Sequence, residues 1–373
     1  MAIPTEALYL DVNADAAVHP NAWKAYVEAS QFFGNPSSSH QAGRAAKSCL
    51  EDARSSVASS INAIPDSLIF TSGGTEADAL ALCGVVRAWQ GDGLPHVICS
   101  NIEHAAIMKT ALMLKERGEI ELDTVAVNRA GMVFPVEVQS LLKANTVLVS
   151  VLLASNETGV LQPIAGITSM VKDHGALMHT DAVQALGRLP IDVEELNVDL
   201  LSLSAHKIGG VGGIGALYIR DKSLIEPTFV GGGQEFGLRS STQNVAGAAA
   251  FAAACQEISP WPTTVRNEFE LRFMNELADI EVIGKNAPRL PNTSCIRFGG
   301  CEADGLLMGL DIQGIGVSTG SACSTGSIEP SSILLAMGLS IEEAKSCIRF
   351  SFPKELSSKE LERVVRITSE LVR

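Results

Sequence analysis

Short apolar runs alternate with helical patterns over residues 68–219, and this alternation constrains the fold more than any other feature of the sequence. A strand followed by a helix that returns the chain to a parallel neighbour predicts a mostly parallel sheet with helices on both faces. Open sheets of this kind bind ligands at the carboxyl ends of their strands. The side chains that follow each predicted strand are therefore the first candidates for a functional site.

The pattern breaks near residue 260. A helix predicted over residues 244–254 is followed by Pro260-Trp261-Pro262, which cannot continue it. Beyond the break, two helical patterns and two short strands predict a smaller α+β unit, at residues 265–277, 358–372, 294–298 and 347–352. We expect a large domain over residues 15–258 and a small domain formed by residues 1–14 and 259–373.

Composition narrows the class of protein. The chain has 373 residues, 46% of them hydrophobic, which is enough for a large core and, at about 150 residues per domain, for two domains. Its formal net charge of −14 argues against a nucleic-acid partner. The eight cysteines form no CxxC pair and no zinc spacing, so we expect no metal site and a reducing compartment. Residues 1–10 lack a signal-peptide pattern and no apolar run approaches about 20 residues, so we expect a cytoplasmic protein with no membrane partner.

Lys207 follows the apolar run over residues 198–203, which places an amine at the carboxyl end of a predicted buried strand. A lysine held in a desolvated site can form an imine with a carbonyl cofactor, and pyridoxal phosphate is the commonest of these. A strand-end lysine that simply faces water is the alternative. The residues around it decide between the two.

Asp181 and Gln184 follow a short apolar strand over residues 176–180. A carboxylate in this place can keep a pyridinium nitrogen protonated, which preserves the ring as an electron sink. Gln184 can then hydrogen-bond the ring oxygen. Taken alone, Asp181 could equally be a helix cap.

A strand, a glycine turn and a helix occupy residues 68–89. Gly73 and Gly74 allow close approach of an anion, Thr75 adds a hydroxyl, and the helix N-terminus adds free N–H groups. The stretch matches neither the P-loop nor the GxGxxG pattern, so we expect a phosphate rather than a nucleotide.

His104 and Asn156 also follow apolar strands, so five strand ends in a row carry polar groups. An imidazole can stack on a pyridine ring, and an amide can donate to its phenolic oxygen. A lone histidine in such a place is more often a cap, but the series favours one shared pocket.

Cys323 lies between Gly320 and Gly326 among small hydroxyl residues, and Pro330 marks the start of the next predicted helix. A thiol on such a loop can swing to a bound substrate and act as a nucleophile. Inert cysteines are more often found within apolar elements.

Together these motifs resemble the pyridoxal-phosphate cysteine desulfurases, the NifS/IscS-like branch of the class V aminotransferase family. The resemblance runs along nearly the whole chain and rests on residues 9–11, 34–38, 71–78, 103–104, 156–159, 179–184, 204–207, 231–242, 321–330 and 348–351. It implies the pyridoxal-phosphate fold type I, an α/β fold with a large domain on a mostly parallel sheet and a smaller α+β domain.

By this resemblance Lys207 would bind the cofactor covalently and Asp181 would hold its ring nitrogen. His104 would stack on the ring and move a proton. Asn156 and Gln184 would contact the ring oxygen, and Asn156 would also contact the substrate.

The resemblance also assigns the cofactor phosphate and the substrate. The phosphate would be held by Thr75, Ser204 and His206. Thr242 would reach the phosphate of a partner subunit, which implies a homodimer with shared active sites. Arg349 would hold the substrate carboxylate, to which its planar fork is suited. Cys323 would attack the sulfur of L-cysteine and become a persulfide, leaving alanine.

The chain departs from the family in several places, among them two segments near the expected site. Residues 12–17 lack two hydroxyls that the family has near the substrate, and residues 211–213 lack a proline and a lysine. The resemblance implies a sulfur-acceptor protein such as an iron-sulfur scaffold, but iron-sulfur clusters, tRNA thiolation and DNA backbone modification all stay open as destinations.

Three other functions stay open. A cysteine, cystine or selenocysteine lyase would share Lys207 and Asp181 without needing Cys323. A transaminase would form a keto acid instead of alanine. A sulfur carrier or scaffold with the same fold would bind no cofactor.

Overall fold

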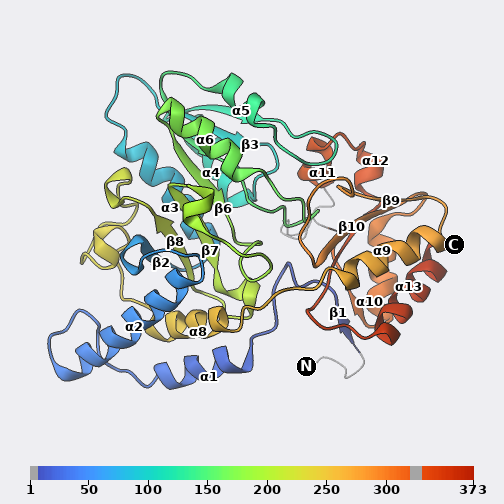
Figure 1. Cartoon of the computed structure of the whole chain (residues 1–373), viewed down its shortest axis with the longest axis horizontal. Helices are drawn as coiled ribbons and strands as arrows, with labels where there is room; N and C mark the ends of the chain where they lie inside the picture. Colours follow the sequence, from blue (N-terminus) through green and yellow to red (C-terminus); the bar gives the residue numbers. More distant parts are fainter. Residues whose placement is uncertain (1–6, 320–329) are drawn as a thin grey trace.

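The computed structural model describes residues 7–319 and 330–373 (Figure 1). Its centre is a seven-stranded sheet in the order β2-β8-β7-β6-β5-β3-β4. The strands are β2 (Leu68–Thr71), β3 (His96–Ser100), β4 (Glu121–Val125), β5 (Thr146–Ser150), β6 (Leu177–Asp181), β7 (Leu200–Ser204) and β8 (Gly215–Ile219). All pairings are parallel except those of β8, which runs antiparallel to β2 and β7. The mostly parallel sheet predicted from the sequence is confirmed.

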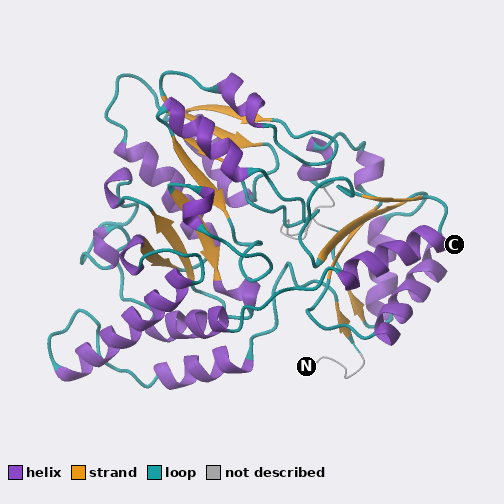
Figure 2. Cartoon of the chain, viewed as in Figure 1, coloured by secondary structure: helices purple, strands orange, loops and turns teal. Residues whose placement is uncertain are grey.

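Helices cover both faces of this sheet (Figure 2), which explains why β7 and β8 are buried along their whole length. Adjacent residues Leu200 and Leu201 belong to two different core clusters, one on each face. One face carries α3 (Gly74–Ala88) and α4 (Ala105–Glu116). The other carries α2 (Gln41–Ser59), α5 (Pro135–Leu141), α6 (Ile164–His174) and α8 (Val245–Gln256). Two further helices complete this part, α1 (Pro20–Ala29), which packs on α8, and the short α7 (Val193–Leu196).

The C-terminal elements form a second, smaller layered unit, drawn in orange and red in Figure 1. An antiparallel sheet in the order β12-β10-β9 packs on helices around a cluster of phenylalanines that includes Phe269, Phe273 and Phe350. Its elements are α9 (Thr264–Glu276), β9 (Ile280–Val282), β10 (Thr293–Phe298), α10 (Ala303–Ile312), β11 (Ile315–Gly316), α11 (Ser332–Ala336), α12 (Ile341–Ala344), β12 (Cys347–Ser351) and α13 (Ser358–Val372). The N-terminal strand β1 (Leu8–Tyr9) joins it by pairing with β11.

The elements expected beyond residue 244 occur within two residues of the expected bounds. Pro330 lies just before α11, whose N-cap is Ser331. We propose the domain division expected from the sequence, because the core of the small unit takes its residues from Leu8 and Leu10, in and just after β1, and from residue 269 onward. None of the helices in the described part of the chain is long and apolar enough to cross a lipid bilayer.

A buried ion pair fixes the loop over residues 231–243, which carries Thr242. Arg54 of α2 donates to both carboxylate oxygens of Glu235, at 2.7 and 2.9 Å, and both side chains are 1% exposed. The same carboxylate accepts from the Phe70 N–H of β2 at 2.8 Å. Glu235 and Phe236 both adopt left-handed backbone conformations, with φ of 48° and 58°, which side chains other than glycine rarely take. The ion pair therefore stabilises a loop conformation that the backbone alone disfavours.

Glu235→Gln is expected to lower the free energy of unfolding by about 3 kcal/mol, because it removes the buried carboxylate that pairs with Arg54 and leaves the guanidinium with only the partly exposed Glu51 as a charged partner. Urea denaturation measures this change. Adding Arg54→Met to the variant should restore part of the loss, since the unpaired charge is then gone. The exposed pair of Arg366 and Glu370 provides the control: Glu370→Gln should change the value by less than about 1 kcal/mol. A Glu235→Gln protein as stable as the wild type would contradict a stabilising pair.

Candidate active site

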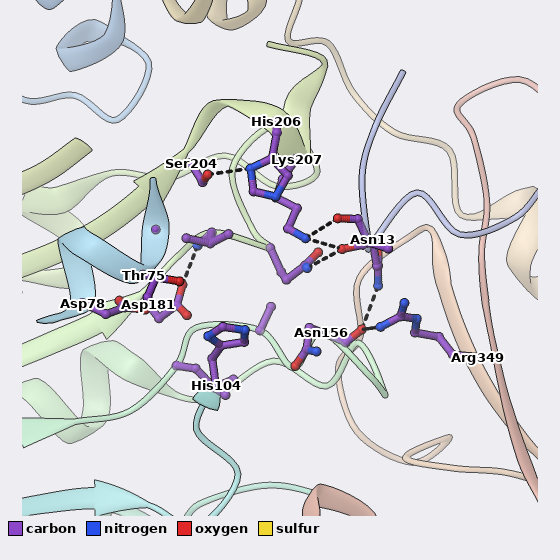
Figure 3. A pocket seen from close by; sticks show the side chains of 16 residues that line it. Asn13, Thr75, Asp78, His104, Asn156, Asp181, Ser204, His206, Lys207 and Arg349 are labelled. Carbon is purple, nitrogen blue, oxygen red and sulfur yellow. Dashed lines mark hydrogen bonds between the residues drawn. The ribbon is translucent and has the colours of Figure 1, made fainter. Parts of the chain in front are cut away.

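A cavity of about 380 Å³ opens at the carboxyl edge of the seven-stranded sheet (Figure 3). Among the residues that line it are ten of those selected from the sequence: Gly74, Thr75, His104, Asn156, Asp181, Gln184, Ser204, His206, Lys207 and Arg349. Nine follow or end strands of this sheet, and Arg349 comes from β12. The cavity therefore lies where open parallel sheets bind their ligands.

Lys207 lies in a single 3-10 turn, Ala205–Ile208, directly after β7. Gly209 ends this turn with φ of 83°, a left-handed conformation that suits glycine. The Lys207 Nζ donates hydrogen bonds to the main-chain oxygens of Asn13, at 2.7 Å, and Ala14, at 2.6 Å. The amine therefore points into the cavity rather than into bulk water.

Asp181 ends β6 and is 8% exposed. Its Oδ1 accepts from the Val183 N–H at 2.8 Å. Burial raises the pKa of this carboxyl, and the nearby His104 and Lys207 oppose the shift. A cationic group bound in the cavity would favour its ionised form.

Two buried groups lie behind Asp181, namely Asp78 of α3 and His179 of β6. Burial, and after it the charge of Asp181, hold the pKa of Asp78 well above its usual range. Burial lowers the pKa of His179 to about 3, and its ring nitrogens contact the hydroxyls of Ser150 and Ser202 at 2.9 and 3.0 Å. Burial therefore opposes the charged form of both groups.

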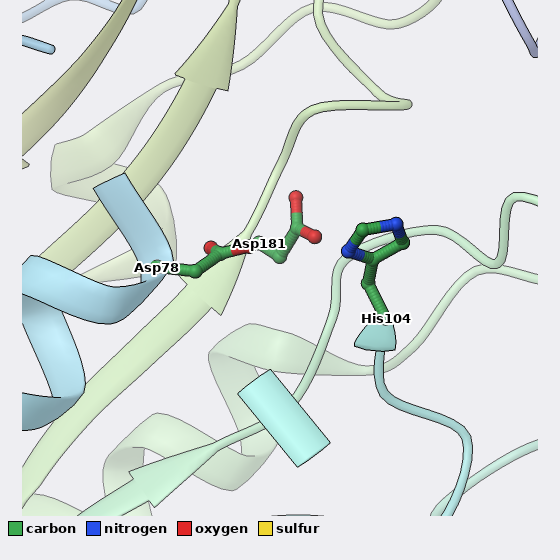
Figure 4. A group of neighbouring side chains, drawn as sticks. All are labelled: Asp78, His104 and Asp181. Carbon is green, nitrogen blue, oxygen red and sulfur yellow. The ribbon is translucent and has the colours of Figure 1, made fainter. Parts of the chain in front are cut away.

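Asp78, His104 and Asp181 lie close enough to share a ligand, with one donor atom from each within 4.8 Å of the others (Figure 4). His104 is the N-cap of α4, and its Nδ1 accepts from the Ala106 N–H at 3.2 Å. Figure 4 shows its ring beside the Asp181 carboxylate. A flat cationic ring could lie against His104 with its positive nitrogen at Asp181. Such a ring would place a positive charge beside the buried carboxyl groups, with no metal ion required.

The N-terminus of α3 forms one end of the cavity. Gly73 is its N-cap and offers no side chain to the free N–H groups of the first turn, which are left for an anion. A Cβ added to Gly74 would come within 2.8 Å of the Val183 side chain, so a larger residue would crowd the cavity. The hydroxyl of Ser204 contacts His206 Nδ1 at 2.8 Å, and the Ser204 Cβ would lie 3.6 Å from a Cβ added to Gly74, so these side chains belong to the same end of the cavity.

Arg349 holds its guanidinium against two acceptors. Its Nη2 contacts Asp11 Oδ1 at 2.5 Å, and its Nη1 donates to the main-chain oxygen of Asn156 at 3.1 Å. Its Nε and the Oε1 of Gln184 are buried and have no hydrogen-bond partner among the described residues. Leaving such atoms unsatisfied costs about 1–3 kcal/mol each. Both are therefore suited to a polar ligand.

One described residue that was expected in the site is not among those that line the cavity. Thr242 is exposed on the loop over residues 231–243. Arg239 of the same loop donates to the Glu76 carboxylate in the first turn of α3, at 2.7 and 3.1 Å, so the loop is tied to the anion end of the site. Cys323 lies outside the described residues.

The cavity also includes Asn13, Ala14 and Asp78, which the sequence analysis did not select. Asp78 lies one helical turn after Gly74, inside the motif used for the anion end, and that spacing could have indicated it. Asn13 and Ala14 lie in a segment noted only for departing from the family. Their contribution comes from main-chain oxygens, which leave no signal in residue type.

The protonation of Glu103, next to His104, can be tested through the pH dependence of protein stability. Its Oε1 accepts from Ser100 Oγ at 2.5 Å and from the Leu152 N–H at 2.9 Å, and burial raises its pKa to about 8. In the unfolded chain the pKa of a glutamate carboxyl is about 4.3. Between these two values the unfolded carboxyl loses its proton while the folded one keeps it, so Glu103 makes the protein less stable as the pH rises.

Glu103→Gln, which keeps an acceptor for both donors and cannot ionise, is therefore expected to melt above the wild type at about pH 8 and close to it at about pH 5. Thermal denaturation at the two pH values measures the difference. Glu28→Gln on the exposed face of α1 serves as the control and should show no such dependence. An equal difference at both pH values would mean that Glu103 does not keep its proton.

The fold and the cavity define an α/β protein in which helices cover both faces of the central sheet and Lys207 lines a cavity at its carboxyl edge. The chain belongs to the class V aminotransferase family: the family described as Aminotransferase class-V matches residues 8–364. It is 37% identical over 374 residues to a protein of Dictyoglomus turgidum named Cysteine desulfurase IscS, covering 98% of this chain and 94% of that protein.

Solved structures agree with this family. A protein described as NifS-like matches with a TM-score of 0.89 and 32% identity, covering 98% of this chain and 99% of the other. SspA, solved in complex with cysteine, matches with a TM-score of 0.84 and 31% identity, covering 94% of this chain and 100% of the other.

Proposed function

We propose that this chain is a cysteine desulfurase that uses pyridoxal 5'-phosphate to remove sulfur from L-cysteine, leaving L-alanine and a persulfide on Cys323. The observation that carries the proposal is the presence of Lys207, Asp181 and the N-terminus of α3 around one cavity of about 380 Å³. An amine, a buried acid and an anion site are the three contacts that this cofactor requires. Relatives named cysteine desulfurase match along 98% of the chain.

The chain's own groups fit the cofactor. Lys207 would bind its aldehyde carbon, Asp181 its ring nitrogen, and Gly74 and Thr75 its phosphate. Burial raises the pKa of Asp181 in the protein alone, and a protonated ring nitrogen would give this carboxylate a directly bonded cationic partner. When bound, the cofactor supplies an electron sink that makes the Cα–H bond of an amino acid acidic.

The polar groups of the cavity then act on the substrate. Arg349, with a buried Nε still available among the described residues, would hold the carboxylate of L-cysteine. Lys207, released when the substrate amine takes its place, would move the proton at Cα. His104 would move the proton of the substrate sulfur.

The sulfur transfer is assigned to Cys323. Its thiolate attacks the sulfur of the bound substrate, a sulfur–sulfur bond forms, and the carbon–sulfur bond breaks. The electron pair of the broken bond stays on the substrate carbon and takes up a proton, which gives alanine.

The described residues on either side of Cys323 support its place in the reaction. Ser318 exchanges main-chain hydrogen bonds with Arg349, at 2.6 and 3.2 Å. Ser331, the N-cap of α11, donates its hydroxyl to Glu157, the neighbour of Asn156. The segment that carries the thiol therefore starts and ends next to substrate-binding residues.

The proposal also covers the oligomeric state of the protein and the acceptor of the sulfur. We propose a homodimer in which Thr242 reaches the phosphate site of the partner subunit, since Thr242 is exposed on a loop that is held at the anion end of its own site. The persulfide would pass to an acceptor protein for iron-sulfur cluster assembly or thiolation. The reducing conditions that keep Cys323 reactive suit the cytoplasm.

Single-turnover chemistry on the purified protein tests the function. Enzyme and L-cysteine are mixed, the cofactor spectrum and alanine are followed, and persulfide is trapped by alkylation and located by mass spectrometry. Persulfide on Cys323 with a matching amount of alanine is the expected result. Pyruvate and sulfide without added mass on Cys323 would instead mean a lyase, and a keto acid that retains sulfur would mean a transaminase.

A further inference from the structure

Asn13 is a buried side chain, 1% exposed, at the meeting point of the seven-stranded sheet and the C-terminal unit. Its Nδ2 donates to Thr293 Oγ1 at 2.9 Å and to the main-chain oxygen of Asn156 at 3.1 Å. Its Oδ1 accepts from Asn292 Nδ2 at 3.1 Å. Both polar atoms of the side chain therefore have partners, and these partners come from both parts of the protein. Figure 3 shows the contact with Asn156.

The backbone around Asn13 is fixed as well. The Asn13 N–H donates to Ser351 Oγ at 3.0 Å, and the Ala14 N–H donates to the Asp11 oxygen at 2.9 Å. Arg188, a buried guanidinium, donates to the Val12 oxygen at 3.4 Å. The turn that contains Asn13 thus has a set orientation on the wall of the cavity.

The main-chain oxygens of Asn13 and Ala14 form what we name the carbonyl shelf. Both accept from Lys207 Nζ, at 2.7 and 2.6 Å, and the Asn13 oxygen also accepts from Gln184 Nε2 at 2.9 Å. Two carbonyl acceptors for one amine are the partners that an ammonium group prefers. An amine that forms an imine keeps at most one hydrogen, so it can no longer donate to both oxygens of the shelf, as the free ammonium group does.

We propose that Asn13 is a positioning residue, whose side chain holds the carbonyl shelf that receives Lys207 Nζ whenever this amine is not covalently bonded. This inference rests on the proposed function, in which the substrate displaces the lysine in every turnover. The carbonyl shelf holds the released amine in one position. From this position the amine moves the substrate proton, and it returns there in the next turnover. The position lies in the segment where the chain departs from its family, and its shelf uses backbone oxygens rather than the missing hydroxyls.

A merely structural role for Asn13 would have a different effect. Its side chain joins β10 to the sheet, so its loss would lower stability in either case. Only a positioning role changes how available Lys207 is to a reagent in the folded protein. The chemical reactivity of this one amine therefore separates the two roles, and it does so without cofactor or substrate.

The experiment labels the full-length protein freed of cofactor with a limiting amount of acetic anhydride and compares acetylation of Lys207 with that of the exposed Lys24 by mass spectrometry. Asn13→Ala is expected to raise this ratio roughly tenfold, the change that accompanies loss of one hydrogen bond to a charged group. Thr293→Val, which removes one of the two acceptors of Asn13 Nδ2, should raise it by a smaller factor. Asn21→Ala, on the exposed face of α1, is the matched control and should leave the ratio unchanged.

In the cofactor-loaded enzyme, Asn13→Ala should lower kcat for alanine formation more than it raises KM for L-cysteine. A folded Asn13→Ala protein with the wild-type labelling ratio and kcat would overturn the proposal, and Thr293→Val decides the question if Asn13→Ala does not fold. If the ratio rises as expected but the wild type forms no alanine, the carbonyl shelf stands and the desulfurase function falls.

Discussion

Lys207→Ala is expected to lower kcat for alanine formation by about a thousandfold or more. The variant loses both the covalent link to the cofactor and the base that moves the substrate proton, and general acid–base catalysis alone contributes roughly 10²–10⁴-fold. The side chain lies at a cavity wall and binds two main-chain oxygens, so its removal leaves the core clusters unchanged. Steady-state kinetics, together with the visible spectrum of the protein mixed with the cofactor, measures the loss.

The fold should survive this change, and a melting temperature close to that of the wild type would establish that it does. Lys24→Ala on the exposed face of α1 is the control for removal of a lysine charge and should keep full activity. If Lys207→Ala kept wild-type turnover, another amine would have to bind the cofactor, and the assignment of the whole cavity would be wrong.

Cys323→Ser is expected to abolish trapped persulfide and to reduce alanine formation to a trace. A serine hydroxyl is not ionised near neutral pH and does not attack sulfur, whereas a thiol in a polar loop is partly thiolate. The residues that bind cofactor and substrate are untouched, so adding L-cysteine should still change the cofactor spectrum. The two results together would separate binding from sulfur transfer, and persulfide analysis with parallel spectroscopy provides them.

Cys301 offers a matched control for this experiment. It is half-buried beside the C-terminus of α13, with its Sγ 3.6 Å from the Val372 oxygen, and it is not among the residues that line the cavity. Cys301→Ser should therefore form persulfide and alanine at the wild-type level. Full turnover by Cys323→Ser would favour a lyase over a desulfurase.

Most of the cavity could be predicted from the sequence because its members follow strands of one sheet. A polar residue at a strand end is local information, and the parallel sheet brings the ends of β3, β5, β6 and β7 to one edge. Arg349 was predicted from a resemblance and from the apolar neighbours Ile348 and Phe350, and β12 does hold it beside Asn156. Periodicity did not reveal the antiparallel direction of β8, because a buried strand is apolar in either direction.

The parts that were missed depend on contacts between distant residues. The role of Asn13 comes from partners such as Asn292 and Thr293, at the far end of the sequence, and from main-chain oxygens. The pair of Arg54 and Glu235 joins a helix to a loop that no local pattern connects. Such contacts follow from how the two parts of the chain pack, which composition and periodicity do not specify.

The pairing of β1 with β11 has a consequence for the time at which the site is completed during synthesis. Leu8 of β1 pairs with Ile315 of β11, so β1 can join its sheet only after most of the chain has been synthesised. The carbonyl shelf follows β1 directly and is fixed by Ser351, which is made later still. A nascent or truncated chain would thus hold Lys207 without its shelf. Only a finished polypeptide would complete the site, and sulfur would not be released from cysteine by an incomplete enzyme.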